Sequence, residues 1–411
     1  MPIVECSPLS RVEGHGRVEL HLEQGELVTA RVKLLESPRL FESLVIGRHF
    51  REIPTLVCRI CAICSTVHRV AAASAIEAAL DLTIPLRAQH LRELALLGGQ
   101  IESHALHLFC LVLPDLFNVD SLFALPQESL HLQAGLELKA LGNRLQLSGG
   151  GRSIHPGNIE IGGVLTSPNK KELDQLHRDV EAWLEKITHL LQPFLSAPNW
   201  PATPLKGYPL WLEGGEVPFS GRELVWGNRR RITTADYRSV LQEETCSYSN
   251  ARKTRAQNRP FLTGALARRD YRSGDRGRTD EIDAEGIYAN NRAQAEELMQ
   301  NLLHARDLLK TLRQTTTDEL RRIPQREKAG TGTALFEAPR GILVHHYAID
   351  SRGRIAAADI ITPTAINQCA MEAQLLSDLQ GVAPETMEEQ ASRLIRAFDP
   401  CISCAVHLLK V

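Results

Sequence analysis

The chain has 411 residues, of which 43% are hydrophobic and 23% charged, and its net charge is -2. This length can bury a large core, and the near-neutral charge excludes a bulk attraction to nucleic acid or anionic lipid. No apolar run approaches the roughly 20 residues that span a bilayer, so we expect no membrane span. The N-terminus shows no signal-peptide pattern, and nine cysteines are too few for a disulfide scaffold. We therefore expect a cytoplasmic protein whose thiols serve metal or redox chemistry.

The first regular segment, RVELHLEQGELVTARVKL, alternates apolar and polar residues on either side of Gly25. This pattern predicts a β-hairpin with one buried face, which includes Val28. Helical spacing begins after Pro85 and continues over residues 86–113. Gly98 and Gly99 within this helix indicate close packing against another helix.

Two further long amphipathic helices are predicted over residues 170–195 and 292–315. A shorter helix follows over 386–398, with a capping box from Thr386 to Glu389 and a stop at Pro400. Residues 200–221 and 269–286 are rich in turn-forming or polar residues, and we predict loops there.

These elements predict an α-rich α+β fold, in which a core bundle of long helices carries a small N-terminal antiparallel hairpin or sheet and loop-rich peripheral segments. No composition shift divides the chain, so we expect a single compact catalytic domain over residues 1–411. Its parts are a β-rich start (1–50), the first cysteine motif with the long helices (51–200), a loop-rich and helical segment (201–340), and a C-terminal segment (341–411).

Two Cys-x-x-Cys pairs, Cys61 with Cys64 and Cys401 with Cys404, lie near opposite ends of the chain. Four thiolates can surround one metal, so we expect the N- and C-terminal segments to meet there. Spacing alone leaves a structural zinc site open, and soft thiolates also suit nickel, copper(I) and iron–sulfur clusters. Four unrelated thiols are the remaining alternative. A thioredoxin-like role is disfavoured, because neither pair follows a strand–helix pattern.

Two other motifs have less specific interpretations. His104 and His107 show an H-x-x-H spacing that could bind metal, but packed histidines are favoured at this position on a long helix. The segment GGRSIHPGNIEIGG lacks the strand–helix context of a nucleotide-binding loop.

The residues that flank the cysteines decide between these alternatives. RICAICSTVH and DPCISCAVH closely resemble the two metal-binding signatures of the nickel–iron hydrogenase large subunit. Further segments resemble that family in the same order over almost the whole chain: RVEGHG, ESPRLFESLVIGR, IESHALHLFCLVLPD, GGRSIHPGNIEIGG, GALAR and EAPRG. The details are most similar to the cytoplasmic, multi-subunit, cofactor-coupled branch.

The resemblance implies a Ni–Fe centre in which Cys61 and Cys401 are terminal nickel ligands and Cys64 and Cys404 bridge nickel to iron. In the family the iron carries carbon monoxide and cyanide. The resemblance further implies a proton exit at Glu13 and a hydrogen bond from His68 to a bridging sulfur. It implies that Arg340 polarises hydrogen and that Asp399 orients Arg340.

The resemblance also implies a Mg²⁺ or similar ion bound by Glu42, His407 and a carbonyl near Gln368. Without the resemblance, these residues would be interpreted as surface acids, a surface ion pair, a turn residue and a structural histidine.

The implied activity is the reversible heterolytic cleavage of H₂ to protons and electrons. The other five cysteines form no Cys-x-x-Cys pair, so a partner iron–sulfur small subunit should carry the electrons onward, together with further diaphorase-like or electron-transfer subunits. Maturation proteins would supply the metals. A hydrogen-sensing homologue with low turnover and a zinc-stabilised non-catalytic homologue are the alternatives.

Two departures complete the comparison with the family. Ala62 stands where the family usually has glycine, and a methyl group there could alter the turn. Only four residues follow His407, so we expect maturation without cleavage and Val411 as the mature C-terminus. Leu408 and Leu409 should then be buried, and Lys410 should reach solvent.

Overall fold

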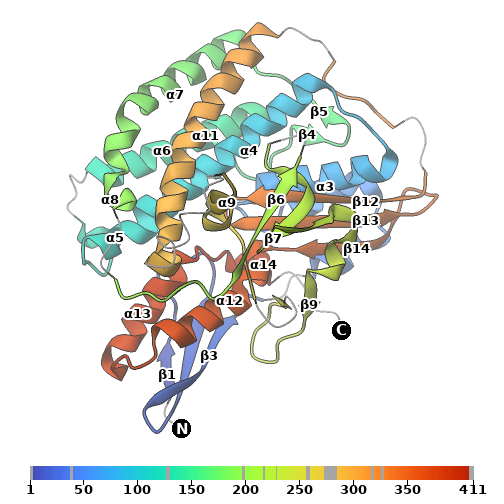
Figure 1. Ribbon diagram of the computed structural model, residues 1–411. Helices are drawn as coiled ribbons and strands as arrows, with labels where there is room; N and C mark the ends of the chain where they lie inside the picture. The colour runs from blue at the N-terminus through green and yellow to red at the C-terminus, as the bar shows by residue number, and fades with distance from the viewer. Residues whose placement is uncertain are drawn as a thin grey trace.

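The structure of the protein is a computed structural model. It describes residues 3–37, 40–125, 130–196, 200–215, 218–227, 229–255, 260–272, 285–315, 319–324 and 328–406. Figure 1 shows long helices at the top, a twisted sheet beside them, and a small N-terminal sheet packed against C-terminal helices at the bottom.

The N-terminal sheet has three antiparallel strands in the order β1-β2-β3. They are β1 (Ile3–Cys6), β2 (Gly16–Glu23) and β3 (Glu26–Leu34). The predicted hairpin is therefore present, but the predicted burial of Val28 is wrong. The register shifts between His21 and Leu22, which places Leu27 in the core and leaves Val28 42% exposed. A bulge of this kind moves a side chain to the opposite face, because side chains alternate along a strand.

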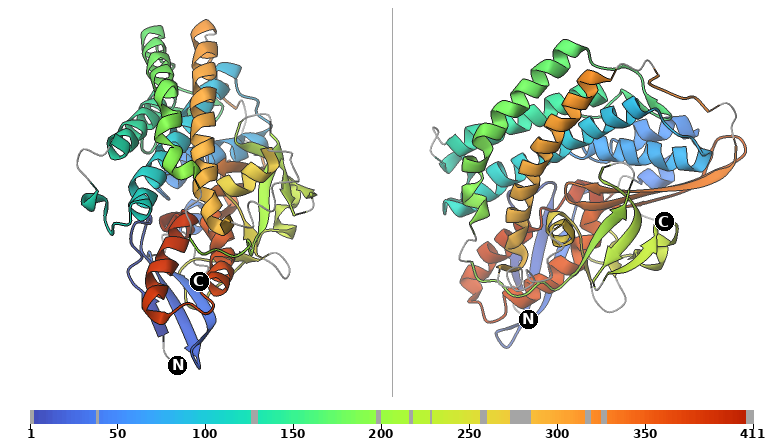
Figure 2. Two further views of the ribbon diagram at one scale, coloured as in Figure 1. Left: turned by 60° about the vertical axis from the view of Figure 1, so that its left-hand side comes forward. Right: turned by 45° about the horizontal axis from the view of Figure 1, so that its top comes forward.

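Long helices form the upper layer, and the views in Figure 2 agree on this arrangement. They are α3 (Ser65–Leu80), α4 (Leu86–Leu106), α6 (Leu130–Gly150), α7 (Lys170–Leu190) and α11 (Ala289–Gln314). Short helices connect or flank them: α1 (Phe41–Val45), α2 (Ile53–Val57), α5 (Leu113–Leu116), α8 (Gln192–Leu195) and α9 (Ala265–Arg272), with a π-helical stretch, His107–Val112, between α4 and α5.

The glycines of α4 allow the close packing that their position predicts. A Cβ atom on Gly98 would lie 2.6 Å from the carbonyl oxygen of Gly142 on α6, and a Cβ on Gly142 would lie 2.6 Å from that of Gly98. Any larger residue at either position would force the helices apart. Within the described residues, one helical run, Leu86–Leu116, is long and apolar enough to cross a membrane, but 89% of its apolar window is buried inside the protein. Such burial is typical of a core helix.

A seven-stranded sheet packs beside the helices, with α3 against β12 and β13 (Figure 1). Its path runs β11-β6-β7-β12-β13-β14, with β8 also on β7, and only the β11–β6 pair is parallel. The strands are β6 (Tyr208–Gly214), β7 (Ser220–Trp226), β8 (Arg230–Thr233), β11 (Phe261–Leu262), β12 (Gly330–Ala338), β13 (Gly341–Ile349) and β14 (Ile355–Ile361). Two small pairs lie outside it: β4 (Ile159–Glu160) with β5 (Gly163–Val164), and β9 (Gln242–Glu244) with β10 (Lys253–Arg255).

The predicted loop over 200–221 is therefore wrong, because it contains β6 and the start of β7. Leu210 and Leu212 are buried against the core of this sheet, although prolines and glycines surround them in the sequence. The second predicted loop, over 269–286, is wrong in its described residues, since α9 extends to Arg272 and a 3₁₀ helix begins at Gly286. Residues 273–284 lie outside the described part of the chain.

The C-terminal segment contains α12 (Pro363–Asp378), α13 (Pro384–Ala397) and α14 (Ile402–Ala405). The predicted capping box on α13 is wrong, because the helix begins earlier, at Pro384, and the Thr386 hydroxyl donates to the Ala383 carbonyl. Proline suits the first helical position, since its missing N–H would have no partner there. Helices α12 and α13 share a hydrophobic core with the N-terminal sheet.

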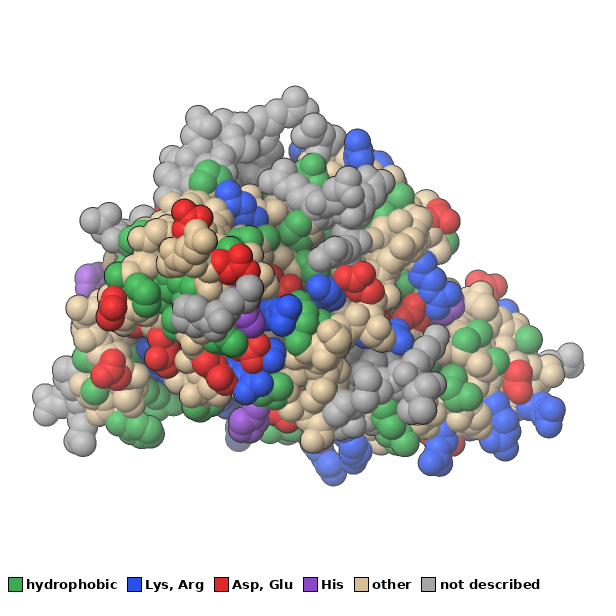
Figure 3. Space-filling model, turned by 90° about the horizontal axis from the view of Figure 1, so that it is seen from below, with side chains coloured by type: hydrophobic (Ala, Val, Ile, Leu, Met, Phe, Trp, Pro, Cys, Tyr) green, Lys and Arg blue, Asp and Glu red, His purple; other side chains and the backbone are tan. Residues whose placement is uncertain are grey.

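The surface carries charges of both signs. Figure 3 shows acidic, basic and hydrophobic side chains scattered over the face that lies at the bottom of Figure 1. This agrees with the net charge of -2, and no single sign dominates that face.

Candidate metal centre

Four cysteine side chains from opposite ends of the chain meet in the core. Cys61 and Cys64 lie between α2 and α3, and Cys401 and Cys404 lie at α14. All four sulfur atoms are buried and lie within 4.8 Å of one another. The Cys61 and Cys401 sulfurs are 3.5 Å apart, and those of Cys64 and Cys404 are 2.7 Å apart. Because a metal–sulfur bond is about 2.3 Å long, two sulfurs that share a metal lie within about 4.6 Å. The four thiols therefore have the spacing of one ligand set.

The N-terminal RVEGHG segment holds the C-terminal pair in place. Glu13 forms a parallel β-bridge with Cys401, and its carbonyl accepts from the Ile402 N–H at 3.1 Å. Its carboxylate Oε2 accepts from the Ser403 N–H at 3.1 Å. Gly14 follows at φ +85, and a Cβ there would lie 2.8 Å from Cβ of Ile402. Only glycine satisfies both the left-handed backbone and this close approach.

A buried cation lies beside the thiols. Arg340 follows β12 and donates from Nε to Oδ1 of Asp399 at 3.0 Å, and both side chains are buried. Its Nη1 and Nη2 atoms are buried and have no hydrogen-bond partner among the described residues. Burial opposes the charge of the guanidinium, but Asp399, Cys401, Glu13 and Cys61 together raise the pKa of Arg340 well above its usual value.

The charges of the thiols depend on one another. Cys401, which can donate to the Cys61 sulfur, lowers the pKa of Cys61 well below its usual value, whereas burial raises the pKa of Cys64. Soft sulfur donors of this kind suit nickel and iron, and the unpaired N–H groups of Arg340 suit an anionic or polarisable group bound beside them. The residues present therefore fit a thiolate-bound metal centre.

Comparisons with known proteins assign the metal. A family model described as nickel-dependent hydrogenase matches residues 39–148 and 235–407, and a HoxL-like model matches residues 3–36. The chain belongs to the nickel-dependent hydrogenase family. It is the large, catalytic subunit of a nickel–iron hydrogenase, and its four buried thiols fit the Ni–Fe centre. Membership of this family favours a Ni–Fe centre over a structural zinc site.

Related sequences cover the whole chain. The alpha subunit of sulfhydrogenase 2 from Pyrococcus furiosus is 36% identical and is aligned over 100% of both chains. The alpha subunit of sulfhydrogenase 1 from the same organism is 31% identical over 98% of this chain and 97% of its own length. The alpha subunit of coenzyme F420 hydrogenase from Methanothermobacter thermautotrophicus is 27% identical over 99% and 95%.

Related structures share the fold. The crystal structure of an NAD⁺-reducing [NiFe]-hydrogenase in the H₂-reduced state is 26% identical, with a TM-score of 0.84 over 99% of this chain and 100% of that one. A Ni-Fe-Se hydrogenase from Desulfomicrobium baculatum is 20% identical, with a TM-score of 0.80 over 99% and 100%, which shows similarity of fold.

His68, which follows the first cysteine motif of the hydrogenase, pairs with a second histidine that sequence reasoning missed. His68 lies on α3, where its backbone N–H bonds the Cys64 carbonyl, and its Nδ1 is 3.0 Å from Nε2 of His345 on β13. The Nδ1 atom of His345 is 2.7 Å from the Tyr347 hydroxyl. No local signal marks His345 in the sequence, because only the packing of α3 on β13 brings the rings together.

The two residues expected to bind Mg²⁺ that the structure describes are both buried. Glu42 on α1 accepts from the Ile360 N–H at 2.7 Å. Gln368 on α12 donates to the Val32 carbonyl, and its Oε1 is buried without a hydrogen-bond partner among the described residues. Both supply oxygen donors of the type that Mg²⁺ prefers. His407 lies outside the described residues, as do Leu408, Leu409, Lys410 and Val411.

Ala62, which replaces the usual glycine, causes no backbone strain. It is exposed and is not among the non-glycine residues with positive φ in the described part of the chain. The backbone at Ala62 therefore does not need glycine, and the methyl group does not have to alter the turn.

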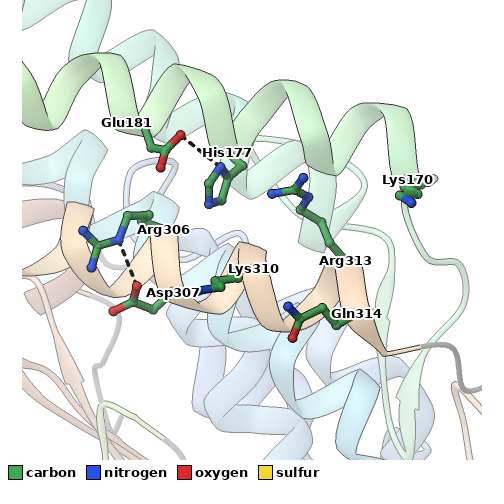
Figure 4. Close-up of a pocket in the computed structure, with 8 residues that line it drawn as sticks. All are labelled: Lys170, His177, Glu181, Arg306, Asp307, Lys310, Arg313 and Gln314. Carbon is green, nitrogen blue, oxygen red and sulfur yellow. Dashed lines mark hydrogen bonds and ion pairs between the residues drawn. The ribbon is translucent and has the colours of Figure 1, made fainter.

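A separate charged cavity of about 530 Å³ lies between α7 and α11 (Figure 4). Arg306 pairs with Asp307, and His177 with Glu181, so several of its charged side chains have partners within it. It contains none of the four cysteines.

Proposed function

We propose that this hydrogenase cleaves H₂ reversibly at a Ni–Fe centre whose iron carries carbon monoxide and cyanide. The cluster of four buried sulfurs within 4.8 Å, beside the unpaired guanidinium nitrogens of Arg340, is the observation that carries the proposal. Cys61, Cys64, Cys401 and Cys404 would hold the centre through their thiolates, with Cys61 and Cys401 on nickel alone and Cys64 and Cys404 shared with iron. Such a centre supplies the heterolytic cleavage of H₂ when it is bound.

The surrounding side chains orient hydrogen and remove the proton. Arg340 would polarise hydrogen through its two unpaired guanidinium nitrogens, while Asp399 fixes the guanidinium through Nε. The Glu13 carboxylate is half-buried and bonds the Ser403 N–H, one residue before Cys404. It can therefore take a proton from the sulfur side and pass it toward solvent. His68 stabilises a bridging sulfur.

A Mg²⁺ or similar ion supports the C-terminal segment in this proposal. Glu42, Gln368 and His407 supply its ligands. The unpaired Oε1 of Gln368 supports it, because a buried oxygen needs a compensating partner. The buried carboxylate of Glu42 supplies the negative charge that a divalent cation prefers.

An iron–sulfur small subunit docks next to the first cysteine pair. Near Cys61, Arg59 and Ala62 are exposed, and Ile154 is 48% exposed on the adjacent segment. That segment is held to the cysteine loop because Nδ1 of His155 lies 3.0 Å from the Cys58 carbonyl oxygen. An exposed apolar side chain on a segment that contacts the cysteine loop suits the surface on which a partner docks.

Further electron-transfer subunits, maturation proteins and a cytoplasmic location complete the proposal. The relatives are named subunits of hydrogenases, and one structural neighbour is NAD⁺-reducing. These names support a multi-subunit enzyme that uses a soluble acceptor.

The test combines three measurements on the purified complex. We expect nickel and iron in place of zinc by elemental analysis, infrared bands of carbon monoxide and cyanide, and hydrogen-dependent reduction of a dye. A complex with the metals and infrared bands but negligible dye reduction would indicate a hydrogen sensor and overturn the proposed catalytic turnover.

A further inference from the structure

The H-x-x-H motif spans the end of α4, with His104, and the start of the π-helical stretch, with His107. Its two rings do not bind one metal, because each ring has a different partner on α11. His104 Nε2 lies 3.0 Å from Oε2 of Glu297, and His107 Nδ1 lies 2.6 Å from Oε1 of Gln294. All four side chains are buried. Two residues three apart on one helix thus face two residues three apart on the other, as helical periodicity allows.

The Gln294 contact leads to the side chain of Arg340. Gln294 donates from Nε2 to Oδ2 of Asp399 at 3.0 Å, while Oδ1 of Asp399 accepts from Arg340 Nε. The amide must be oriented this way, because its oxygen would repel the Asp399 carboxylate in the flipped state. Its oxygen therefore faces His107, whose Nδ1 must carry a proton.

The second ring nitrogen of His107 also faces an acceptor. Nε2 lies 2.8 Å from the Arg396 carbonyl oxygen. Contacts at both ring nitrogens therefore fix the orientation of His107 against Gln294.

The Glu297 contact leads to the backbone of Arg340. Glu297 binds Arg268 through both carboxylate oxygens at 2.7 Å. Arg268 in turn donates to the carbonyls of Ala338 and Pro339 at 3.1 Å each. These are the two residues that precede Arg340, so Arg268 fixes the chain from which the Arg340 side chain extends.

We infer that two histidine pairs form a scaffold that positions Arg340 at the metal centre. The His107–Gln294 pair acts through Asp399, and the His104–Glu297 pair acts through Arg268. Gln294 and His107 are therefore positioning residues for hydrogen cleavage. This inference rests on the proposed role of Arg340, and the experiment separates the two.

Gln294→Met removes both hydrogen bonds at nearly constant volume in the holoenzyme complex. Gln374→Met is the matched control. Gln374 is also a buried helical glutamine that donates to a carboxylate, Asp378 at 2.9 Å, and accepts from a backbone N–H, that of Lys206 at 3.0 Å. Gln374 also donates to the carbonyl and the hydroxyl oxygens of Thr203. The control variant therefore loses at least as many hydrogen bonds as Gln294→Met, but only Gln294 reaches Arg340.

We expect Gln294→Met to retain nickel and to lower kcat about 100-fold, since misplacement of a catalytic group by about 1 Å has such an effect. Gln374→Met should have its melting temperature lowered at least as much as Gln294→Met, with kcat nearly unchanged. In an Arg340→Lys background, Gln294→Met should add little further loss, because the group it positions is already replaced. A crystal structure of the Gln294→Met complex should show the Arg340 side chain displaced.

Equal losses of kcat in the two methionine variants, or a full additional loss in the Arg340→Lys background, would overturn the scaffold. Normal turnover in Arg340→Lys alone would instead overturn the proposed role of Arg340. If Gln294→Met does not accumulate with metal, Gln294→Glu retains the acceptor for His107 but removes the donor to Asp399. The inference then requires a fall in kcat and a displaced Arg340 in that variant.

Discussion

Glu13 and Cys401 pair through their backbones in a parallel β-bridge, although they lie near opposite ends of the chain. The same glutamate contacts the turn between Cys401 and Cys404 with its side chain. The second cysteine pair therefore reaches the centre only when the C-terminal segment docks on the N-terminal RVEGHG segment. Assembly of the thiol cluster and placement of Glu13 are one structural event.

Glu13→Gln should abolish most hydrogen–deuterium exchange activity while nickel and iron stay bound. The amide oxygen can still accept from the Ser403 N–H, but it cannot take up a proton near neutral pH. Glu5→Gln, an exposed change on β1 of the same sheet, is the control. Near-normal exchange in Glu13→Gln would rule out its role as the proton exit.

Arg340→Lys should lower kcat by about 100-fold or more, as the loss of one preorganised donor does in other enzymes. Lysine keeps the charge but lacks the planar guanidinium. The guanidinium bonds Asp399 through one nitrogen and has two further nitrogens without a partner among the described residues. Dye reduction and metal analysis of the same sample measure the effect. Arg144→Lys, which replaces a half-exposed partner of Asp179, should behave as the unaltered enzyme. Loss of nickel from Arg340→Lys would show a role in metal retention instead.

Glu42→Gln should remove the stabilisation by Mg²⁺. The glutamine oxygen still accepts from the Ile360 N–H, so only the charge is lost. An ion present at 100 times its dissociation constant stabilises a fold by about 2.7 kcal/mol. Adding a chelator should therefore lower the melting temperature of the unaltered protein but not of Glu42→Gln. Glu52→Gln, at an exposed glutamate, should keep the chelator response, and a response in both variants would count against the site.

Cys6 should resist alkylation in the folded protein. Burial, with smaller effects of Glu388 and Glu5, raises the pKa of Cys6 to about 12. The folded state therefore keeps the Cys6 thiol protonated at neutral pH. Its rate of alkylation should continue to rise above pH 9, whereas an unfolded thiol with a pKa of about 8.5 is already ionised there. Mass spectrometry after iodoacetamide treatment at several pH values measures this, with the half-buried Cys246 as the internal comparison. Rapid modification of Cys6 at pH 8 would contradict its burial.

Some features could be predicted from the sequence because they depend on neighbours along the chain. The long helices follow from the 3.6-residue spacing of their apolar residues, and the close contact of Gly98 with α6 follows from glycine inside such a pattern. The motifs around both cysteine pairs indicated a metal centre and its family before any fold was known. The packed histidines of the H-x-x-H motif were also favoured over a metal site.

Other features required the tertiary structure. Strand β13 is buried almost throughout, so it lacks the alternation that marks a half-exposed strand. Strand β6 lies among prolines and glycines and is ordered by its neighbours in the sheet. Val28 lies on the exposed face because it is the extra residue of a bulge in β3, which shifts the register against β2.

By itself, the sequence determined the family of this hydrogenase and the four thiols that share one cluster, since thiols at fixed spacing and their flanking motifs are local properties. Only the tertiary structure decided what surrounds them. His345 beside His68, Gln294 beside Asp399, and Arg268 beside the carbonyl groups before Arg340 are contacts between segments far apart in the chain. Packing of helices and strands sets such contacts, and no periodicity within one segment encodes the identity of its partner in another.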